Sequence, residues 1–314
     1  MRAKFKVITP IHIGSGNQIN RYDYVLFENV IGLIEKTKFN ERIRKDKKLF
    51  NEFLKVSENL NDLVEFLEEE VLDDEINEII EANEGILDKL EKNYSRAIEE
   101  FIKDKFLNTP IIPGSSIKGA IRTAILDYIV SKNPELKEIK NPINLEKKVF
   151  GDVKEDALKA LFISDFKPIN YEKRVISPLN RGKKDNPIPV LLEMIVSGEF
   201  EGEIRIEENL LKSSYSKYFK LDYEFIKLAL EHFYESVLNY ENKRFKANQI
   251  YYKKFMIKIG KHSGAGSKSI SNRNIFIRQL KKNLPYQTSI WVDENNNPIG
   301  WGKLEFKEKI WDLC

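Results

Sequence analysis

The spacing of apolar side chains along the chain predicts several strands. Charged residues at positions 2, 4 and 6 alternate with apolar ones at 3, 5 and 7, a period of two that indicates a half-buried strand over 2–8. The runs YDYVLF and VIGLIE predict two strands joined by a turn at Glu28–Asn29. Single strands are predicted for KALFISDF (159–166) and FMIKI (255–259).

Two further apolar stretches predict hairpins. VLLEMIVSGEFEGEIRIE (190–207) contains Ser197–Gly198 near its middle, a dipeptide typical of turns. TSIWVD and IGWGKLEF, separated by turn residues at 294–298, predict a closing hairpin. Residues 167–189 are basic and contain four prolines, which predicts a loop.

Apolar positions at helical spacing predict several helices. After Pro113–Gly114, apolar side chains at 117, 121, 124, 125 and 128 share one helix face, and Ser115 or Ser116 is expected to cap it. Residues 222–240 and 273–283 predict single helices. Residues 39–105, with runs such as LNDLVEFLEEEVL and EINEII, predict a separate acidic helical segment.

This mixture of antiparallel strand pairs and single helices is typical of an α+β protein. We expect two ferredoxin-like (RRM-like) domains. The first spans 1–185 and carries the acidic helical insertion at about 40–105, and the second spans 186–314 and carries a glycine-rich loop.

Composition limits the class of protein. Of 314 residues, 41% are hydrophobic, enough for a substantial core, and 32% are charged. The only cysteine is Cys314, so no intramolecular disulfide is possible and a reducing cytosol is expected. The first ten residues contain no signal-peptide core, and no apolar run reaches the length of a membrane span. We therefore expect a cytoplasmic protein with no membrane partner.

Charge is distributed unevenly along the chain. Residues 51–100 contain 17 acidic and 4 basic residues, a net charge of −13, although the whole chain has a net charge of +3. Residues 241–282 contain 12 Lys and Arg against one acid, Glu241, and aromatic residues are interleaved among them. A basic tract of this kind favours a nucleic-acid partner over a merely solvated face.

The stretch PGSSIKGAIRTAIL (113–126) is close to a phosphate-binding P-loop, which needs GxxxxGK followed by Ser or Thr. Ala120 and Ile121 stand where the lysine and the hydroxyl residue are required, so nucleotide hydrolysis is not expected. A serine-capped helix start with Lys118 and Arg122 one turn apart would still form an anion site. An ordinary amphipathic helix with two solvated charges is an equal alternative on this stretch alone.

Three glycine-containing loops stand out: PIHIGSG (10–16), IPGSSIKGAIRTA (112–124) and IGKHSGAGSKS (259–269). Glycine permits positive φ and close backbone approach, and successive N–H groups in such loops form anion-binding nests. One loop of this kind is often only a turn. Three in a basic protein favour a polyanionic ligand.

These motifs resemble those of the RAMP superfamily of CRISPR–Cas proteins, which are built from ferredoxin-like or RRM-like domains. The resemblance lies in TPIHIGSG (9–16), IPGSSIKGAIRTA (112–124), Ser164–Asp165, IGKHSGAGSK (259–268) and PIGWG (298–302). Within the family, the chain most resembles the subunit that caps the type III-A (Csm) effector complex at the 3′ end of the guide RNA (crRNA). The capping subunits of the III-B complex are an alternative.

The resemblance implies a non-catalytic RNA-binding subunit for antiviral defence. Its implied partners are crRNA and the other type III-A effector subunits, especially the repeating backbone RAMP subunit. Contacts with the RNA backbone would hold guides of many sequences. The residues expected to contact RNA are His12, Gly14, Ser15, Gly16, Ser115, Ser116, Lys118, Arg122, Lys261, His262, Ser263, Gly264, Gly266, Ser267, Lys268 and Arg273.

An enzymatic alternative is a RAMP-family endoribonuclease that processes CRISPR repeat RNA with His12 or His262 as general base. The third histidine, His232, lies in a predicted helix, and Asp165 is expected only to cap the turn after its strand. The sequence contains no Cys/His metal cluster, no paired carboxylates in a glycine-rich context and no nucleophile elbow. We therefore expect no catalytic residue, no metal and no cofactor. A nucleotide-binding regulator is the least favoured alternative.

Overall fold

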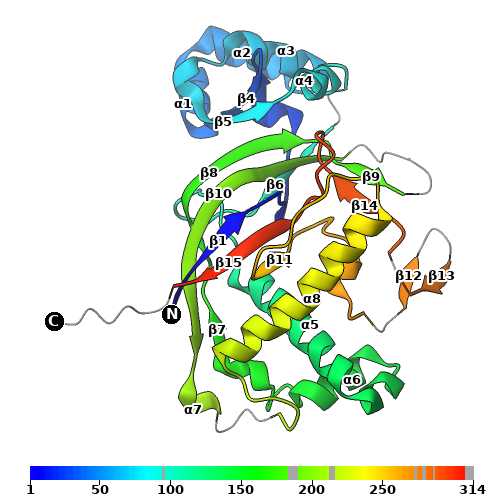
Figure 1. The fold of residues 1–314 in the computed structure, drawn as a ribbon. Helices are drawn as coiled ribbons and strands as arrows, with labels where there is room; N and C mark the ends of the chain where they lie inside the picture. The colour runs from blue at the N-terminus through cyan, green and yellow to red at the C-terminus, as the bar shows by residue number, and fades with distance from the viewer. Residues whose placement is uncertain are drawn as a thin grey trace.

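The computed structural model describes residues 1–93, 96–182, 190–211, 216–271, 274–277, 281–285 and 287–307. Helices and strands are mixed along this part of the chain, which confirms the α+β class. An eleven-stranded sheet dominates it (Figure 1). Its main path runs through β11 (Met256–Lys258), β15 (Trp301–Phe306), β1 (Arg2–Val7), β10 (Leu191–Ile206), β8 (Lys167–Ile176), β5 (Ile76–Ala82), β4 (Val30–Ile34) and β3 (Tyr24–Leu26), with β2 (Gly14–Ile19), β6 (Ile98–Phe101) and β7 (Leu161–Ile163) branching from it.

The period-two pattern at the N-terminus forms β1, as predicted. β1 lies between β10 and β15, and Phe5 is opposite Phe200 on one neighbour and Leu304 on the other. All three side chains are buried. The alternate side chain Lys4 pairs with Glu199 (2.9 Å) on the opposite face. The predicted hairpin of β3 and β4 is also confirmed.

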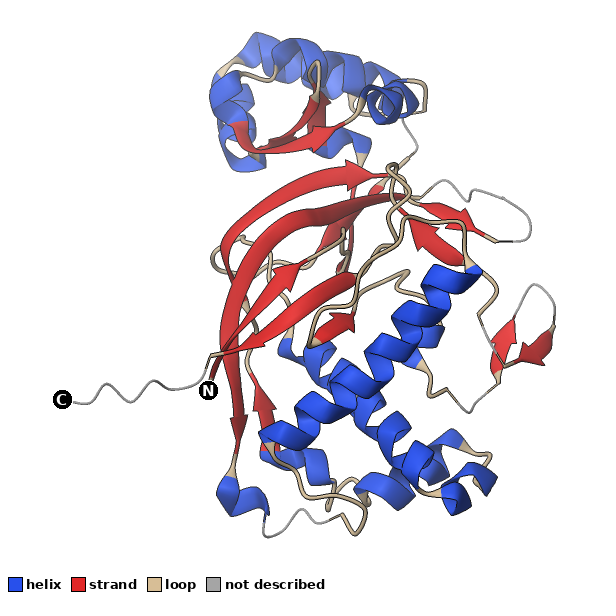
Figure 2. Ribbon diagram, viewed as in Figure 1, coloured by secondary structure: helices blue, strands red, loops and turns tan. Residues whose placement is uncertain are grey.

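Helices cover one face of the large sheet (Figure 2). α5 (Gly114–Lys132) and α8 (Tyr223–Arg244) pack against each other, and the Tyr234 hydroxyl on α8 donates to the Ala120 carbonyl on α5 (3.4 Å). The apolar face predicted for α5 is confirmed, because Ile117, Ile121, Ala124 and Ile125 are all buried. The other helical elements of this part are α6 (Pro142–Phe150), α7 (Glu208–Leu211) and the 3-10 turns Pro134–Glu138, Ala157–Ala160 and Gly266–Lys268. None of the described helices is long and apolar enough to cross a membrane.

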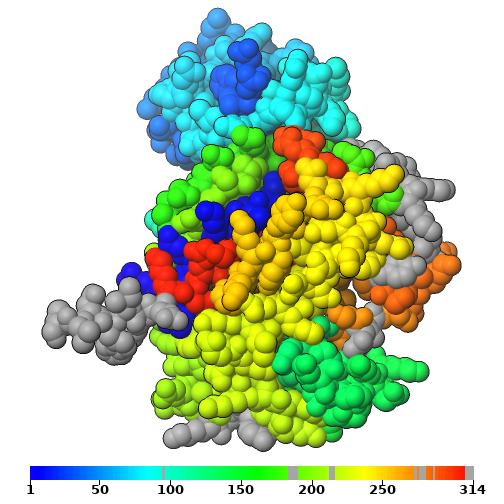
Figure 3. Space-filling model, in the orientation of Figure 1, coloured from blue at the N-terminus to red at the C-terminus, as the bar shows by residue number. Residues whose placement is uncertain are grey.

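Residues 20–93 form a lobe at one end of the large sheet, which we call the acidic lobe (Figures 1 and 3). It contains 20 acidic and 11 basic residues. Besides β3, β4 and β5 it holds α1 (Lys36–Lys45), α2 (Lys47–Val56), α3 (Leu60–Glu70), α4 (Glu84–Glu91) and the 3-10 turns Arg21–Asp23 and Asp73–Glu75. At its base β2 pairs antiparallel with β6, with Ile19 opposite Ile98. The chain therefore leaves and re-enters the body at neighbouring points.

The prediction of an all-helical segment over 39–105 is wrong in part. EINEII forms strand β5, whose β-branched Ile79 and Ile80 pair with Gly32 and Ile31 of β4. The end of the predicted segment forms β6. β-branched side chains favour a pleated surface, and the exposed acidic residues between them gave the stretch a helical appearance.

Two predictions around the longest strands are also wrong. Ser197–Gly198 does not turn a hairpin, because β10 continues through it as one strand, with a register shift against β8. Gly198 has a φ of +140° at this bulge, so the dipeptide bends the strand. Residues 167–176 form β8 and not a loop. Pro168 is tolerated because this half of β8 pairs only with β10 among the described strands, and an edge strand can lack an N–H.

Two C-terminal predictions are wrong, whereas the strand predicted at 255–259 is confirmed as β11. The predicted helix over 273–283 is instead the strand pair β12 (Ile275–Ile277) and β13 (Lys282–Leu284). The closing hairpin has its turn, but its two strands part: β14 (Ile290–Val292) pairs with β9 (Leu179–Arg181), while β15 joins β1 and β11. Burial of Trp301 and Leu304 in the main core outweighs local pairing.

Candidate nucleic-acid interface

The N-terminal loop at 9–16 lies against the C-terminal glycine loop at 260–268. The amide of Lys261 donates to the carbonyl oxygen of His12 (2.7 Å). Gly260 has a φ of +90°, and a Cβ there would lie 2.4 Å from the same carbonyl oxygen. Only glycine permits this close packing of the two loops.

The far end of the glycine loop meets α5. The Asp127 carboxylate on α5 accepts a hydrogen bond from the amide of Ser271 (2.6 Å). Arg122 from α5 and Lys268 from the loop line one cavity of about 680 Å³. The glycine loop therefore connects the other two sequence motifs, and the structure brings all three together.

Gln287, a residue that sequence reasoning missed, supports the glycine loop from its buried side. It is 3% exposed. Its Oε1 accepts from the amide of Gly266 (2.9 Å), and its Nε2 donates to Glu241 (3.1 Å). Gly264 has a φ of +90°, and a Cβ there would lie 2.6 Å from the Gln287 Oε1. Gly264 and Gly266 therefore allow the loop to keep one backbone shape against Gln287.

Glu241 continues this support into the core. Its carboxylate accepts two hydrogen bonds from the Lys258 ammonium (2.6 and 2.8 Å) and one from the Trp301 indole (3.2 Å). All three side chains are buried. Burial lowers the pKa of Lys258, and the Glu241 charge opposes that shift. The available signal was that Glu241 is the only acid in the basic tract 241–282.

The candidate serines of the glycine loop face inward. The Ser263 hydroxyl donates to the Gly260 carbonyl (2.9 Å), and the Ser267 hydroxyl donates to the carbonyls of Ser263 (3.1 Å) and Gly264 (3.0 Å). Both serines are buried. Their hydroxyls hold the loop together, so the backbone and the lysines are left to face a ligand.

The start of α5 is not capped by serine, which corrects the prediction for Ser115 and Ser116. The N-cap position is Pro113, which has no side-chain hydrogen bond to offer. The Asp165 carboxylate instead accepts from the amide of Gly114 (2.9 Å). Asp165 does act as a cap, but for a helix 51 residues away in the sequence, and proximity in sequence could not reveal that.

Lys118 and Arg122 lie one turn apart on α5, and both have partners within the protein. The Lys118 ammonium donates to the Leu161 carbonyl (2.6 Å), and partial burial lowers its pKa. The Arg122 guanidinium donates to Glu146 (3.0 Å) and Asp156 (2.8 Å). These contacts fix where both cations point. These two hydrogen bonds leave other N–H groups of the guanidinium available.

His12 is fully buried in the N-terminal loop. Its Nδ1 donates to the Glu193 carbonyl (2.7 Å), while its Nε2 lies 3.7 Å from a Glu99 carboxylate oxygen and has no hydrogen-bond partner among the residues that the structure describes. Burial lowers the pKa of its imidazole. The ring packs edge-on against Phe101. His12 therefore positions the loop and offers no charge to a ligand.

His262 lies in the glycine loop with a φ of +61°, and its ring packs on Trp291 (4.2 Å between ring centres). Burial lowers its pKa to about 4, with repulsion from Lys261 as the next cause. The imidazole is therefore neutral near pH 7. Like His12, it is placed to pack and not to attract phosphate.

The remaining candidates divide between paired and open cations. The Lys261 ammonium pairs with the Glu99 carboxylate. Lys268 is exposed, and it forms no ion pair within the part of the chain that the structure describes. Gly14 and Gly16 are exposed, and Gly16 has a φ of +92°. Arg273 lies outside the described residues.

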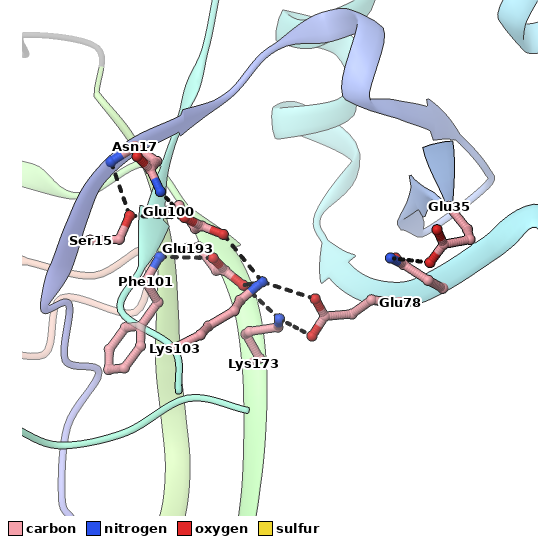
Figure 4. Close-up of polar contacts among 10 residues, drawn as sticks. Ser15, Asn17, Glu35, Glu78, Glu100, Phe101, Lys103, Lys173 and Glu193 are labelled. Atoms are coloured by element: carbon pink, nitrogen blue, oxygen red, sulfur yellow. Dashed lines mark hydrogen bonds and ion pairs between the residues drawn. The ribbon is translucent and has the colours of Figure 1, made fainter. Parts of the chain in front are cut away.

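Ser15 begins a charge network that anchors the N-terminal loop (Figure 4). Its hydroxyl donates to Glu100 (2.9 Å), which lies 3.6 Å from the Lys103 ammonium. Lys103 also pairs with Glu78 on β5 (3.1 Å) and Glu193 on β10 (3.7 Å). The buried Lys173 on β8 pairs with the same two carboxylates. This network joins the loop, the main sheet and the acidic lobe.

No group of three or more His, Cys, Asp or Glu side chains in the described part of the chain could hold a metal ion.

A family model for the RAMP superfamily matches residues 4–269. The chain belongs to the RAMP superfamily. Its described architecture of one mixed sheet with helices on a face is thus a RAMP fold.

This RAMP protein is similar to two curated relatives, both called "CRISPR system Cms protein Csm5". The relative from Methanocaldococcus jannaschii is 29% identical over 283 residues, which cover 82% of this chain and 66% of that protein. The relative from Streptococcus thermophilus is 28% identical over 211 residues, which cover 60% of this chain and 58% of that protein. The matches therefore span 66% and 58% of the relatives' own lengths.

Two solved structures share the fold. One is a chain of a Csm–crRNA–target RNA ternary complex in a type III-A CRISPR–Cas system, with a TM-score of 0.77 and 22% identity, covering 97% of this chain and all of that one. The other is Csm5 of T. onnurineus, with a TM-score of 0.68 and 20% identity, covering 96% of this chain and all of that one.

Proposed function

We propose that this RAMP protein is an RNA-binding structural subunit of a type III-A CRISPR–Cas (Csm) effector complex. It caps the complex at the 3′ end of the crRNA and acts in the cytoplasm in antiviral defence. Its partners are the crRNA and the other Csm subunits, especially the repeating backbone RAMP subunit. The observation that carries the proposal is the joining of three glycine motifs into one surface, in a chain similar to Csm5 over 82% of its length.

The proposed mode of RNA binding is through the phosphate backbone. The glycine loop presents main-chain N–H groups in a shape set by Gln287 and by the positive φ of Gly264. Lys268 adds positive charge beside it, and Arg122, which is paired with Glu146 and Asp156, offers its remaining N–H groups. Contacts of this type position RNA without reading its sequence, as a subunit serving many guides requires. The sixteen residues named from the sequence stay our proposed site residues, with His12, His262, Ser263 and Ser267 acting through loop shape.

A non-catalytic role is part of the proposal. The endoribonuclease alternative needs His12 or His262 to take a proton from a ribose hydroxyl. His12 is fully buried, and its Nε2 is enclosed within the protein, while His262 packs on Trp291. Similarity to Csm5 and to a Csm-complex chain favours the structural role as well.

We also propose that the RAMP fold here derives from two ferredoxin-like units, 1–185 and 186–314, with the acidic segment inserted in the first. Strands on both sides of residue 185 share the large sheet, since β10 pairs with β1 and β8, and β15 pairs with β1. The close approach of β2 and β6 at the base of the acidic lobe supports an insertion at that point.

Affinity purification of the tagged protein from its native host tests this proposal. We expect a multi-subunit assembly containing small RNAs with a uniform 5′ end. Incubation of the purified assembly with a repeat hairpin, with and without chelator, should leave the hairpin intact. Recovery of the protein alone and free of RNA, or cleavage of the hairpin that is lost in a His262→Ala variant, would contradict it.

A further inference from the structure

The cavity between α5, the turn Pro134–Glu138, α6 and the end of the glycine loop has a volume of about 680 Å³. That volume lies within the range of pockets that hold small organic ligands. Its floor is apolar and consists of Leu126, Val130, Leu136, Ile139, Leu145 and Ile270. Most of these side chains are also part of the main core, so the floor is already formed in the free protein.

The rim of this cavity is basic. Arg122, Lys137, Lys140 and Lys268 line it, and Glu146 is the only acid among its lining residues. Lys137 and Lys268 form no ion pair among the described residues. An anion placed between these two ammonium groups would be stabilised by electrostatic attraction, because the cavity is partly enclosed.

Arg122 gives the rim a rigid element. Its guanidinium donates to Glu146 (3.0 Å) and Asp156 (2.8 Å) and lies 4.1 Å from the centre of the Phe150 ring. A cation that is already held in place loses little conformational entropy when a ligand binds. Polar side chains complete the lining, namely Thr123, Ser269, Asn274 and Asn283. Amide side chains supply both donors and acceptors for a base edge.

We propose that this cavity holds one unpaired nucleotide of the guide RNA, with its base over the apolar floor and its phosphate at the basic rim. The inference rests on the proposed RNA-binding function and deepens it. A free phosphate would leave the apolar floor unused. An acidic peptide would need an extended groove, whereas one cavity of this volume suits a single residue of a polymer.

The rim is tested by titrating a fluorescein-labelled single-stranded 12-mer RNA into the full-length protein at several salt concentrations. The double variant Lys137→Gln/Lys268→Gln should bind more weakly, and the slope of log affinity against log salt should fall by about 0.7 per lost phosphate contact. Lys132→Gln is the matched control, because this exposed lysine lies on α5 but does not line the cavity. It should bind as the wild type does.

The floor is tested by Thr123→Phe, which fills the cavity from the α5 wall without changing charge. It should weaken RNA binding about tenfold, in the range of one lost base contact, and leave the salt slope unchanged. Lys132→Phe places the same ring on α5 outside the cavity and should bind as Lys132→Gln does. Thermal melting of every variant checks that the fold is intact.

The outcomes separate the two proposals. If the wild type binds RNA, and both Thr123→Phe and the lysine pair bind it equally well, the cavity is not a nucleotide site but RNA binding stands. If neither the wild type nor its assembly binds RNA, the proposed function itself is wrong. If the variants bind RNA normally but no longer recover the other subunits, the cavity docks a protein segment and the nucleotide assignment is wrong.

Discussion

At the scale of single residues, the glycine loop depends on buried side chains outside the loop itself. Gln287 touches the loop, Glu241 holds Gln287, and Lys258 balances the charge of Glu241. A buried carboxylate is stable only with such partners. The position of the loop is therefore coupled to the core.

Replacement of Glu241 by Gln should destabilise the protein by about 3 kcal/mol, because it leaves the Lys258 ammonium buried without a counter-charge. Urea denaturation measures the loss. The double variant Glu241→Gln/Lys258→Met should recover most of it. Glu305→Gln removes a partly exposed pair with Lys303 and should change stability by less than about 1 kcal/mol. Equal effects of Glu241→Gln and Glu305→Gln would show that the buried pair does not matter.

His262 should make stability depend on pH. Its pKa is lowered to about 4 by burial, from an ordinary value of 6.5. Between these values the unfolded state binds more protons, so stability falls as pH drops from 6.5 towards 4, by up to about 1.4 kcal/mol per pH unit, and is unaffected above 6.5. His262→Asn, which tolerates the positive φ, should lose this component. Urea denaturation at pH 7, 6 and 5 compares the two, and parallel profiles would refute the assignment.

At the scale of elements, the sequence predicted what local patterning determines. The apolar face of α5, the helix α8, the alternation of β1 and the β3–β4 hairpin follow from period and turn residues. The path of β10 through Ser197–Gly198 could not be predicted, because a bulge and a turn use the same residue types. The cap on α5 could not be predicted either, since Asp165 reaches it through the fold.

The glycine loop should be more sensitive to its glycines than to its serines. Gly264→Val introduces a β-branched side chain at a φ of +90° and places Cβ 2.6 Å from Gln287. We expect loss of RNA binding by about tenfold or more, since the loop must change shape. Ser263→Ala removes the hydrogen bond to the Gly260 carbonyl and a longer one from the Ser267 hydroxyl (3.4 Å), and it should cost about 1 kcal/mol of stability with RNA binding largely kept.

RNA titration and thermal melting of both variants measure these effects. If Gly264→Val bound RNA as tightly as Ser263→Ala while its fold was intact, the shape of this loop would not matter for RNA.

At the scale of the whole molecule, the excess of positive charge and the three motifs proposed to contact RNA lie in the body, while the acidic lobe lies at one end of the large sheet (Figure 3). A net negative lobe repels the phosphate backbone, so the guide is expected to run away from it. The lobe is fastened by Glu78, which pairs with Lys103 and Lys173. Composition predicted the charge asymmetry, but only the strand pairing reveals where the lobe begins and ends.

Replacing residues 20–97 by a short Asn-Gly turn between Ile19 and Ile98 should give a folded body that binds RNA within about twofold of the wild type. Loss of Glu78 leaves Lys173 with fewer counter-charges, so the truncation should include Lys173→Met to remove the surplus buried charge. RNA titration and melting curves, recorded for the truncation with and without Lys173→Met, measure its RNA affinity and its stability. A folded truncation without RNA affinity would contradict the charge argument.

The central claim is that the N-terminal loop, the start of α5 and the glycine loop form one surface that holds the guide RNA. Ultraviolet cross-linking of the purified assembly, followed by mass spectrometry of the cross-linked peptides, tests it most directly. We predict cross-links from this chain in 9–16, 114–122 and 260–270, and a marked loss of all three sets in Gly264→Val. Cross-links confined to the acidic lobe or to strands β1 and β15, with none in the three motifs, would contradict the account.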